Sequence, residues 1–267
     1  MNRPLLRYHG GKWKLADWIL SHMPPHRTYV EPYGGAASVL LQKARSYAEV
    51  YNDLDGEIVN LFRVCRESGE ALCRAVELTP FARAEYAASR KPSDDPVEQA
   101  RRTLIRSFMG FGSNAINRSS GFRSNTTRSG TVPAADWRNF PGALRLIVDR
   151  LRGVVIENRP ALEVITAHDG DETLFYIDPP YALETRDRGK DYKYEMTEAD
   201  HREMARALNG VNGMVIVSGY ACELYDEDLF AGWHRVSRRA MADGARERTE
   251  VLWMRNVRQG GLFAASA

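Results

Sequence analysis

Residues 174–181 join an apolar segment to side chains that could do chemistry. The run from Leu174 to Ile177 is typical of a buried strand, and Asp178-Pro179-Pro180-Tyr181 follows it directly. Proline lacks the N–H that a sheet requires and fixes φ, so the chain must leave the sheet here in an extended conformation. We therefore expect a carboxylate, backbone carbonyls and an aromatic ring at the carboxyl end of a strand, where open α/β sheets bind ligands.

These groups suit a nucleobase amine. The Asp178 carboxylate and the Pro179 carbonyl are two acceptors, and an NH2 group carries two donors. Tyr181 offers a stacking surface for a flat heterocycle. The segment thus predicts a pocket for the exocyclic amine of a base extruded from a duplex, with fixed acceptors that stabilise the positive charge developing on its nitrogen. A strand-ending turn capped by Asp178 is the alternative interpretation.

Two strands nearer the N-terminus are candidates for holding a nucleotide-like cofactor. Residues 28–31 form the first, and a turn of small residues at 32–38 leads into an expected helix start at 39–41, which favours a cofactor against a helix N-terminus. The second strand ends at Asp53, 18 residues after Gly35. This is close to the spacing of roughly 20 residues for a carboxylate on ribose hydroxyls.

The remaining periodicity predicts a Rossmann-like mixed α/β sheet interrupted by a helical lobe. Residues 56–110 are helical in pattern without a strand of their own, and Asp55 is placed to cap the first of these helices. Further elements are expected as a helix at 136–151, a strand at 153–157, a helix at 160–167, strands at 173–177 and 211–218, a helix from Thr197, a short helix at 223–229, and a closing hairpin at 232–239 and 248–255. We predict a catalytic domain from residues 1–55 and 153–258, a recognition lobe at 56–152 and a flexible tail at 259–267.

The lobe also carries a long polar loop and an excess of positive charge. Residues 101–152 contain ten arginines and two aspartates, whereas the whole chain has a net charge of only +2. A polar loop of this length is uncommon in a compact domain unless it is functional or disordered, and its arginine, asparagine and serine side chains suit phosphates and base edges. The predicted DNA-binding residues are Ser113, Asn117, Arg118, Arg123, Asn125 and Arg128. A second charged loop at 182–195 follows the proposed pocket directly and is predicted to be a lid.

Composition narrows the class of protein. No apolar run approaches the roughly 20 residues that span a bilayer, and the N-terminus lacks the pattern of a secretion signal. The three cysteines form no Cys-x-x-Cys pair, which indicates a reducing cytoplasm. His22 and His26 have helical spacing, but Pro24-Pro25 between them breaks the helix, so no metal site is expected. We also expect the protein to be a monomer.

Taken in order, these motifs resemble the DNA adenine methylase family (the D12 class of N6-adenine-specific DNA methyltransferases) from about residue 5 to residue 256. The carrying motifs are Tyr8-His9-Gly10-Gly11-Lys12, Glu31-Pro32-Tyr33-Gly34-Gly35-Ala36-Ala37-Ser38-Val39, Asn52-Asp53, Asp178-Pro179-Pro180-Tyr181 and Thr249-Glu250-Val251-Leu252-Trp253. The resemblance implies S-adenosylmethionine as cofactor and adenine N6 in double-stranded DNA as target. It further implies that the cofactor is held by Tyr8, Gly10, Gly11, Lys12, Glu31, Pro32, Tyr33, Gly35, Asp53 and Asp178, with Asp178 through Tyr181 catalytic.

Two positions depart from the family pattern. Ala37 stands where glycine is usual, which crowds the cofactor loop, and Pro160 stands where relatives commonly carry an Asp near the cofactor adenine. Methylation of cytosine N4 is an alternative, although Asp rather than Ser before Pro-Pro-Tyr favours adenine. A DNA-binding protein on a decayed methylase scaffold is an alternative from another class. No cysteine lies in a motif for nucleophilic attack, which argues against cytosine C5 chemistry.

Overall fold

A computed structural model describes residues 3–118, 120–126, 132–186, 192–241 and 247–257. Within them a seven-stranded sheet has the order β3-β2-β1-β4-β5-β7-β6. The strands are β1 (Thr28–Glu31), β2 (Ala48–Asn52), β3 (Val154–Glu157), β4 (Thr173–Ile177), β5 (Met214–Tyr220), β6 (His234–Met241) and β7 (Glu247–Arg255). The strands β1 to β5 pair in parallel, and β7 lies antiparallel to both β5 and β6. The predicted mixed Rossmann-like sheet is confirmed.

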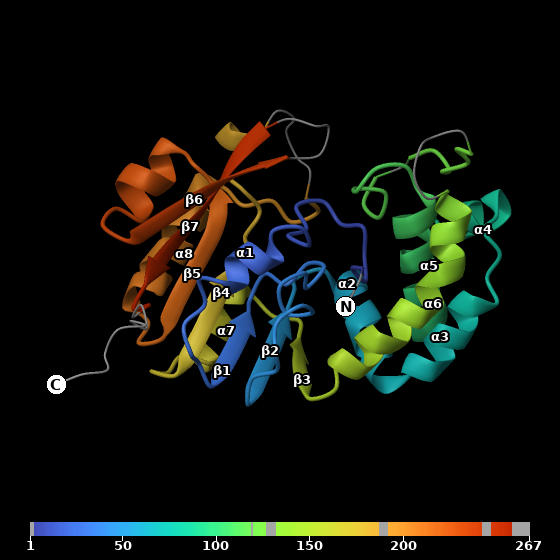
Figure 1. Ribbon diagram of the computed structural model, residues 1–267, viewed down its shortest axis with the longest axis horizontal. Coiled ribbons are helices and arrows are strands. Elements are labelled where there is room, and N and C mark those ends of the chain that lie inside the picture. The colour runs from blue at the N-terminus through green and yellow to red at the C-terminus, as the bar shows by residue number, and fades with distance from the viewer. Residues whose placement is uncertain (1–2, 119, 127–131, 187–191, 242–246, 258–267) are drawn as a thin grey trace.

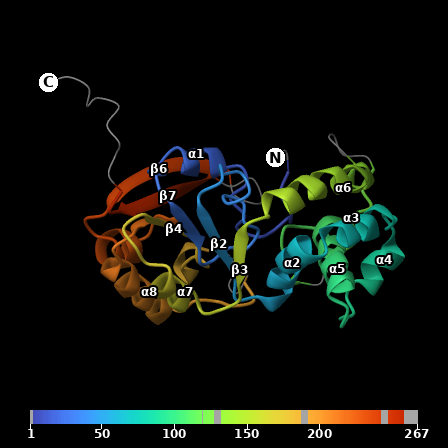
Figure 2. The same cartoon turned by 90° about the horizontal axis from the view of Figure 1, so that it is seen from below.

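Helices cover both faces of this sheet (Figure 2). On one face lie α7 (Ala161–Ala167) and α8 (Glu198–Gly210), and on the other lies the short α1 (Ala16–Leu20). The central strands are apolar on both sides, as parallel strands buried between layers of helices must be. Thus Val30 packs in the α7 and α8 layer, whereas Tyr29 packs in the opposite layer.

The helical lobe stands beside the β3 edge (Figure 1). It consists of α2 (Gly56–Glu67), α3 (Gly69–Glu77), α4 (Arg83–Ala88), α5 (Pro96–Met109) and α6 (Pro133–Arg150). Asp55 caps α2 by accepting a hydrogen bond from the N–H of Glu57 at 3.0 Å, as predicted. The core of the lobe continues into the core of the sheet, because the ring of Phe62 on α2 stacks on that of Tyr51 on β2 with centroids 4.1 Å apart. The domain boundaries given above stay predictions.

The prediction that a helix begins after the glycine-rich turn is wrong. Between β1 and β2 no helix is present, and residues 36–43 form successive turns instead. Ala37 has a left-handed φ of +51° and Gly35 one of +47°, so the chain rotates out of helical geometry where a helix would begin. Any cofactor at this turn must therefore be held by side chains and turn backbone, not by a helix dipole.

The sheet topology gathers the predicted motifs. Because β1, β2 and β4 are parallel neighbours, their carboxyl ends meet at one edge. Glu31, Asp53 and Asp178 each stand at or just after the end of one of these strands. Within the described part of the chain, no helix is long and apolar enough to span a bilayer.

Candidate active site

A cavity of about 330 Å³ opens at this edge. This is the lower end of the size range of small-molecule sites, roughly 300–1,000 Å³. It is lined by eleven of the residues that the sequence predicted: Tyr8, Gly10, Gly11, Lys12, Glu31, Pro32, Tyr33, Gly35, Asp53, Asp178 and Pro180. The motif after β4 and the turn after β1 therefore share one cavity, as the sequence predicted.

An ion pair between a buried lysine and a partly buried aspartate joins the N-terminal motif to the motif after β4. Lys12 Nζ lies 3.0 Å from Asp178 Oδ1 and donates to the Gly10 carbonyl at 2.7 Å. Lys12 is only 4% exposed. Burial opposes charge on the ammonium, but the carboxylates of Asp178 and Glu250 outweigh it and raise the pKa of Lys12. Burial raises the pKa of Asp178, against the lowering effect of Lys12.

Tyr181 lies behind the cavity and not in its lining. Its hydroxyl donates to Glu250 Oε2 at 3.0 Å, and the Lys12 ammonium lies 4.6 Å from its ring centroid. Tyr220 packs edge-on against the same ring with centroids 4.7 Å apart. The ring is 5% exposed, so a base can stack on it only after a neighbouring side chain moves. Pro179, which the sequence predicted to supply a carbonyl, is also outside the cavity lining.

Asp53 is held by backbone donors at the end of β2. One carboxylate oxygen accepts the N–H of Gly35 at 2.8 Å, and the other accepts the N–H of Asp55 at 2.7 Å. Burial raises the pKa of Asp53 to about 6 in spite of these hydrogen bonds. Each oxygen keeps a further lone pair for a ligand hydroxyl. The geometry is suited to a sugar diol.

Glu31 is a buried acid on the cavity wall. Its Oε1 accepts the Tyr29 hydroxyl at 2.6 Å and the Leu40 N–H at 2.8 Å. Burial raises the pKa of Glu31 to about 7, although both hydrogen bonds oppose the shift. The side chain is 2% exposed and links β1 to the turns that replace the expected helix.

The described end of the predicted lid lies against the N-terminal motif. Tyr192 packs edge-on against His9 with ring centroids 5.4 Å apart, and a Cβ on Gly10 would come within 2.5 Å of the Tyr192 hydroxyl. Lys193 Nζ reaches across the cavity to Asp55 Oδ1 at 2.7 Å. Residues 192–196 line the cavity, while the part of the predicted lid at 187–191 lies outside the described residues.

Breaking the Lys193–Asp55 contact is expected to weaken ligand binding modestly. Lys193 is 47% exposed, and exposed ion pairs are worth roughly 0.2–1 kcal/mol. For the S-adenosylmethionine that the sequence motifs imply, we expect Lys193→Met to raise the Kd by no more than about fivefold, since about 1.4 kcal/mol corresponds to a factor of ten. Isothermal titration at low and high salt measures this, with Lys91→Met on the exposed lobe surface as the control. An unchanged Kd at low salt would exclude a role for the contact in cofactor retention.

Several residues around the cavity were not singled out from the sequence as site residues. The sequence predicts Glu250 only as part of a closing strand. The one feature that could have marked it as functional is its position as an acidic residue directly before the apolar run Val251–Met254. For Tyr192 and Lys193, the sequence offers no indication of a role in the site beyond their position in a charged loop. Asp55 was identified as a helix cap and is one, but it also anchors Lys193.

The polar loop lies in the lobe and outside the cavity lining. Phe122 packs against Phe81 with ring centroids 5.1 Å apart, so this aromatic residue anchors the loop. Arg123 is partly buried and donates to the Phe108 carbonyl at 2.9 Å. Of the remaining predicted DNA-binding residues, Asn117, Arg118 and Asn125 are exposed, Ser113 is partly buried, and Arg128 lies outside the described residues.

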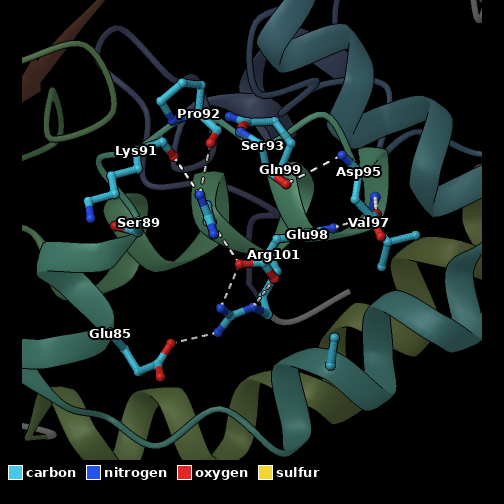
Figure 3. A network of polar contacts seen from close by, with 12 residues as sticks. Glu85, Ser89, Lys91, Pro92, Ser93, Asp95, Val97, Glu98, Gln99 and Arg101 are labelled. Carbon is cyan, nitrogen blue, oxygen red and sulfur yellow. Dashed lines mark hydrogen bonds and ion pairs between the residues drawn. The ribbon is translucent and has the colours of Figure 1, made fainter.

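Most of the positive charge counted between residues 101 and 152 is compensated by carboxylates. Arg101 contacts both Glu98 and Glu85 (Figure 3). The other paired arginines are Arg102 with Glu98, Arg106 with Glu57, Arg145 with Glu77, Arg150 with Glu49 and Arg152 with Asp149. Several of these acids lie before residue 101, so the charge excess of the segment overstates the positive potential of the lobe.

Fold, cavity and motif order together define the class of this protein. The profile of the D12 class N6 adenine-specific DNA methyltransferase family matches residues 8–241, and the chain belongs to that family.

Among individual proteins, the chain is similar to two DNA adenine methylases over 191 residues, or 68% of its length. It is 25% identical to the protein of Haemophilus influenzae and 27% identical to that of Escherichia coli K12, and the alignments cover 64% and 66% of those relatives. A solved structure described as a conserved hypothetical protein of Streptococcus pyogenes matches 92% of this chain and 97% of its own, at a TM-score of 0.41 and 9% identity. That likeness is too weak to add to the assignment.

Proposed function

We propose that this protein transfers the methyl group of S-adenosylmethionine to N6 of adenine in double-stranded DNA. The observation that carries the proposal is the single cavity that Asp178 shares with Tyr8, Gly35 and Asp53. Asp178 borders the expected position of the reacting amine, and Asp53 borders the expected position of a sugar. Family membership supports the same reaction.

The lining of the cavity fits the cofactor. Asp53 offers acceptors for vicinal hydroxyls, and Tyr33 with Leu162 offers an apolar wall for a purine. Gly35 leaves room at the turn, because a Cβ there would lie 3.1 Å from the Tyr8 ring. Pro160 also lines this wall and brings no acceptor to it beyond its backbone. S-adenosylmethionine supplies a methyl group on a positively charged sulfur.

The residues after β4 would act on the target amine. Asp178 would accept one of its N–H groups, and the Pro179 carbonyl would accept the other once it is exposed to the cavity, from whose lining it is absent. Both acceptors would stabilise the positive charge that builds on nitrogen as its lone pair attacks the methyl carbon. The C–N bond would form as the C–S bond breaks, with the C–S electron pair leaving on S-adenosylhomocysteine, and the nitrogen would then lose one proton to solvent water. The displacement is direct, and no covalent enzyme intermediate is formed. Among the described residues no cluster of His, Cys, Asp or Glu is arranged to hold a metal ion.

The product of the reaction tests the proposal. Duplex DNA is incubated with the protein and S-adenosylmethionine, digested to nucleosides and analysed by mass spectrometry. N6-methyladenine is the expected product. N4-methylcytosine would favour the cytosine alternative, and retention of DNA binding with neither product would favour a decayed scaffold.

The exposed part of the polar loop is proposed to contact the DNA backbone. Arg118 is exposed, whereas the Arg123 side chain contacts the lobe itself. We expect Arg118→Glu to weaken duplex binding several-fold and to reduce the salt dependence of log K by about 1, the signature of one lost phosphate contact. Fluorescence anisotropy over a salt series measures both quantities. Arg63→Glu, with the same charge change on an exposed face of α2, is the control, and equal affinity of the two variants would contradict the assignment.

A further inference from the structure

Glu250 is a buried acid in an otherwise apolar part of β7. It is 6% exposed, and Val251, Leu252, Trp253 and Met254 after it are all buried. In the sheet register it lies opposite Tyr220 of β5. Directly opposed residues of antiparallel strands project to the same face. A buried carboxylate needs partners to remain ionised, and these partners indicate what it does.

The contacts of Glu250 lead to the catalytic motif. Tyr181 donates its hydroxyl to Glu250 Oε2 at 3.0 Å, and the same hydroxyl lies 3.3 Å from Ser218 Oγ. Lys12 lies over the Tyr181 ring and pairs with Asp178. Burial raises the pKa of Glu250, and the Lys12 ammonium opposes that shift. The buried carboxylate of Glu250 and the partly buried carboxylate of Asp178 therefore both act on the charge of one lysine.

This arrangement bears on how Asp178 can act. The lone pairs of Asp178 that Lys12 engages are not available to a target amine. The Glu250 carboxylate attracts the same ammonium electrostatically. Granted the proposed function, we propose that Glu250 is a positioning residue, which acts through Lys12 and Tyr181 to keep Asp178 free to accept the target amine.

The charge of Glu250 can be separated from its hydrogen bond. The titratable and charged groups on its face of the sheet are Lys12, Tyr176, Asp178, Tyr181, Tyr220, Arg238 and Arg248. Glu250→Gln keeps an oxygen for the Tyr181 hydroxyl but removes a negative charge beside Asp178. The pKa of Asp178 should then fall. If Glu250 only held Tyr181 in place, Glu250→Gln, which keeps that hydrogen bond, would leave kcat unchanged even though the pKa of Asp178 falls.

The test compares Glu250→Gln with wild type and with Glu70→Gln, an exposed acid on α3. With saturating DNA duplex and S-adenosylmethionine, we expect kcat of Glu250→Gln to fall roughly 5–10-fold, the scale of coupling within one polar network. The acid limb of its pH profile should move to lower pH. Carbon NMR of the Asp178 carboxyl group in the protein alone should report the same shift without any turnover.

The possible results distinguish a failure of this inference from a failure of the proposed function. Wild-type kcat or an unmoved Asp178 titration in Glu250→Gln, with wild-type methylation intact, would overturn this inference alone. Absence of adenine methylation by wild type would overturn the proposed function and the inference with it. If Glu250→Gln does not fold, Glu250→Asp and Glu250→Asn form a pair of equal size, and equal rates in that pair would refute a role for the charge.

Discussion

Asp178→Ala is expected to lower the rate of methyl transfer at least 10²–10³-fold, roughly the effect of removing one preorganised group that stabilises transition-state charge. The substitution also leaves Lys12 without the carboxylate that it contacts at 3.0 Å. Breaking a buried pair by removing one partner costs roughly 3–5 kcal/mol, so stability should fall as well. The rate is measured as N6-methyladenine formed per minute by the folded fraction, which urea unfolding defines.

Two further variants separate these effects. Asp178→Asn keeps the shape and one acceptor oxygen, so its rate should lie between those of wild type and Asp178→Ala. Asp171→Ala removes an exposed carboxylate just before the amino end of the same strand and should leave the rate unchanged. The catalytic assignment is wrong if Asp178→Ala methylates adenine as fast as wild type.

Glu31→Gln is expected to make the protein more stable at pH 8 but not at pH 5. Burial raises the pKa of Glu31 from 4.5 to about 7, so the folded state binds this proton more tightly than the unfolded chain. Stability from this group is therefore fully present below the unfolded pKa and is lost as pH rises through the folded one. At about 1.4 kcal/mol per pKa unit the loss is on the order of 3 kcal/mol. The glutamine oxygen can still accept hydrogen bonds from Tyr29 and Leu40. Because glutamine does not ionise, the variant does not lose this stability at high pH.

A second buried glutamate on the neighbouring strand should behave in the opposite way. Although burial opposes ionisation, the Arg150 guanidinium and Lys43 hold the pKa of Glu49 below its usual range. Glu49→Gln should therefore destabilise the protein by roughly 3–5 kcal/mol at neutral pH, because Arg150 loses its buried partner. Its deficit should be present at both pH 5 and pH 8 and should shrink only below the usual glutamate pKa of 4.5, as pH falls through the lowered pKa of the folded state. Urea unfolding of both variants at pH 5 and pH 8 checks the two signs, and parallel behaviour would contradict the assigned charge states.

The sequence was most informative where structure is set locally. Apolar runs predicted the strands, and the two prolines after Asp178 placed the end of β4 correctly. The order of motifs predicted one cofactor site with Tyr8, Gly35 and Asp53, and all three residues line the same cavity. These signals come from short stretches of chain, in which periodicity and backbone restriction act directly.

What the sequence could not predict depends on pairing between distant segments. Glu250 meets a hydroxyl 69 positions away, and the guanidinium of Arg150 finds Glu49 at a separation of 101 residues. A charge count along the chain cannot detect such neutralisation, so it overestimated the basic character of the lobe. The helix expected after Ser38 failed for a conformational reason, since the left-handed φ of Ala37 is not readable from an alanine.

The stacking of Phe62 on Tyr51 makes the helices α2 to α6 and the sheet parts of one apolar interior. A helical lobe fused to the sheet in this way cannot be exchanged between relatives as a unit without redesigning the face of β2 beneath it. Diversification of target preference is therefore expected to proceed through the exposed loop positions around Asn117, Arg118 and Asn125, whose side chains can change while the shared interior is preserved.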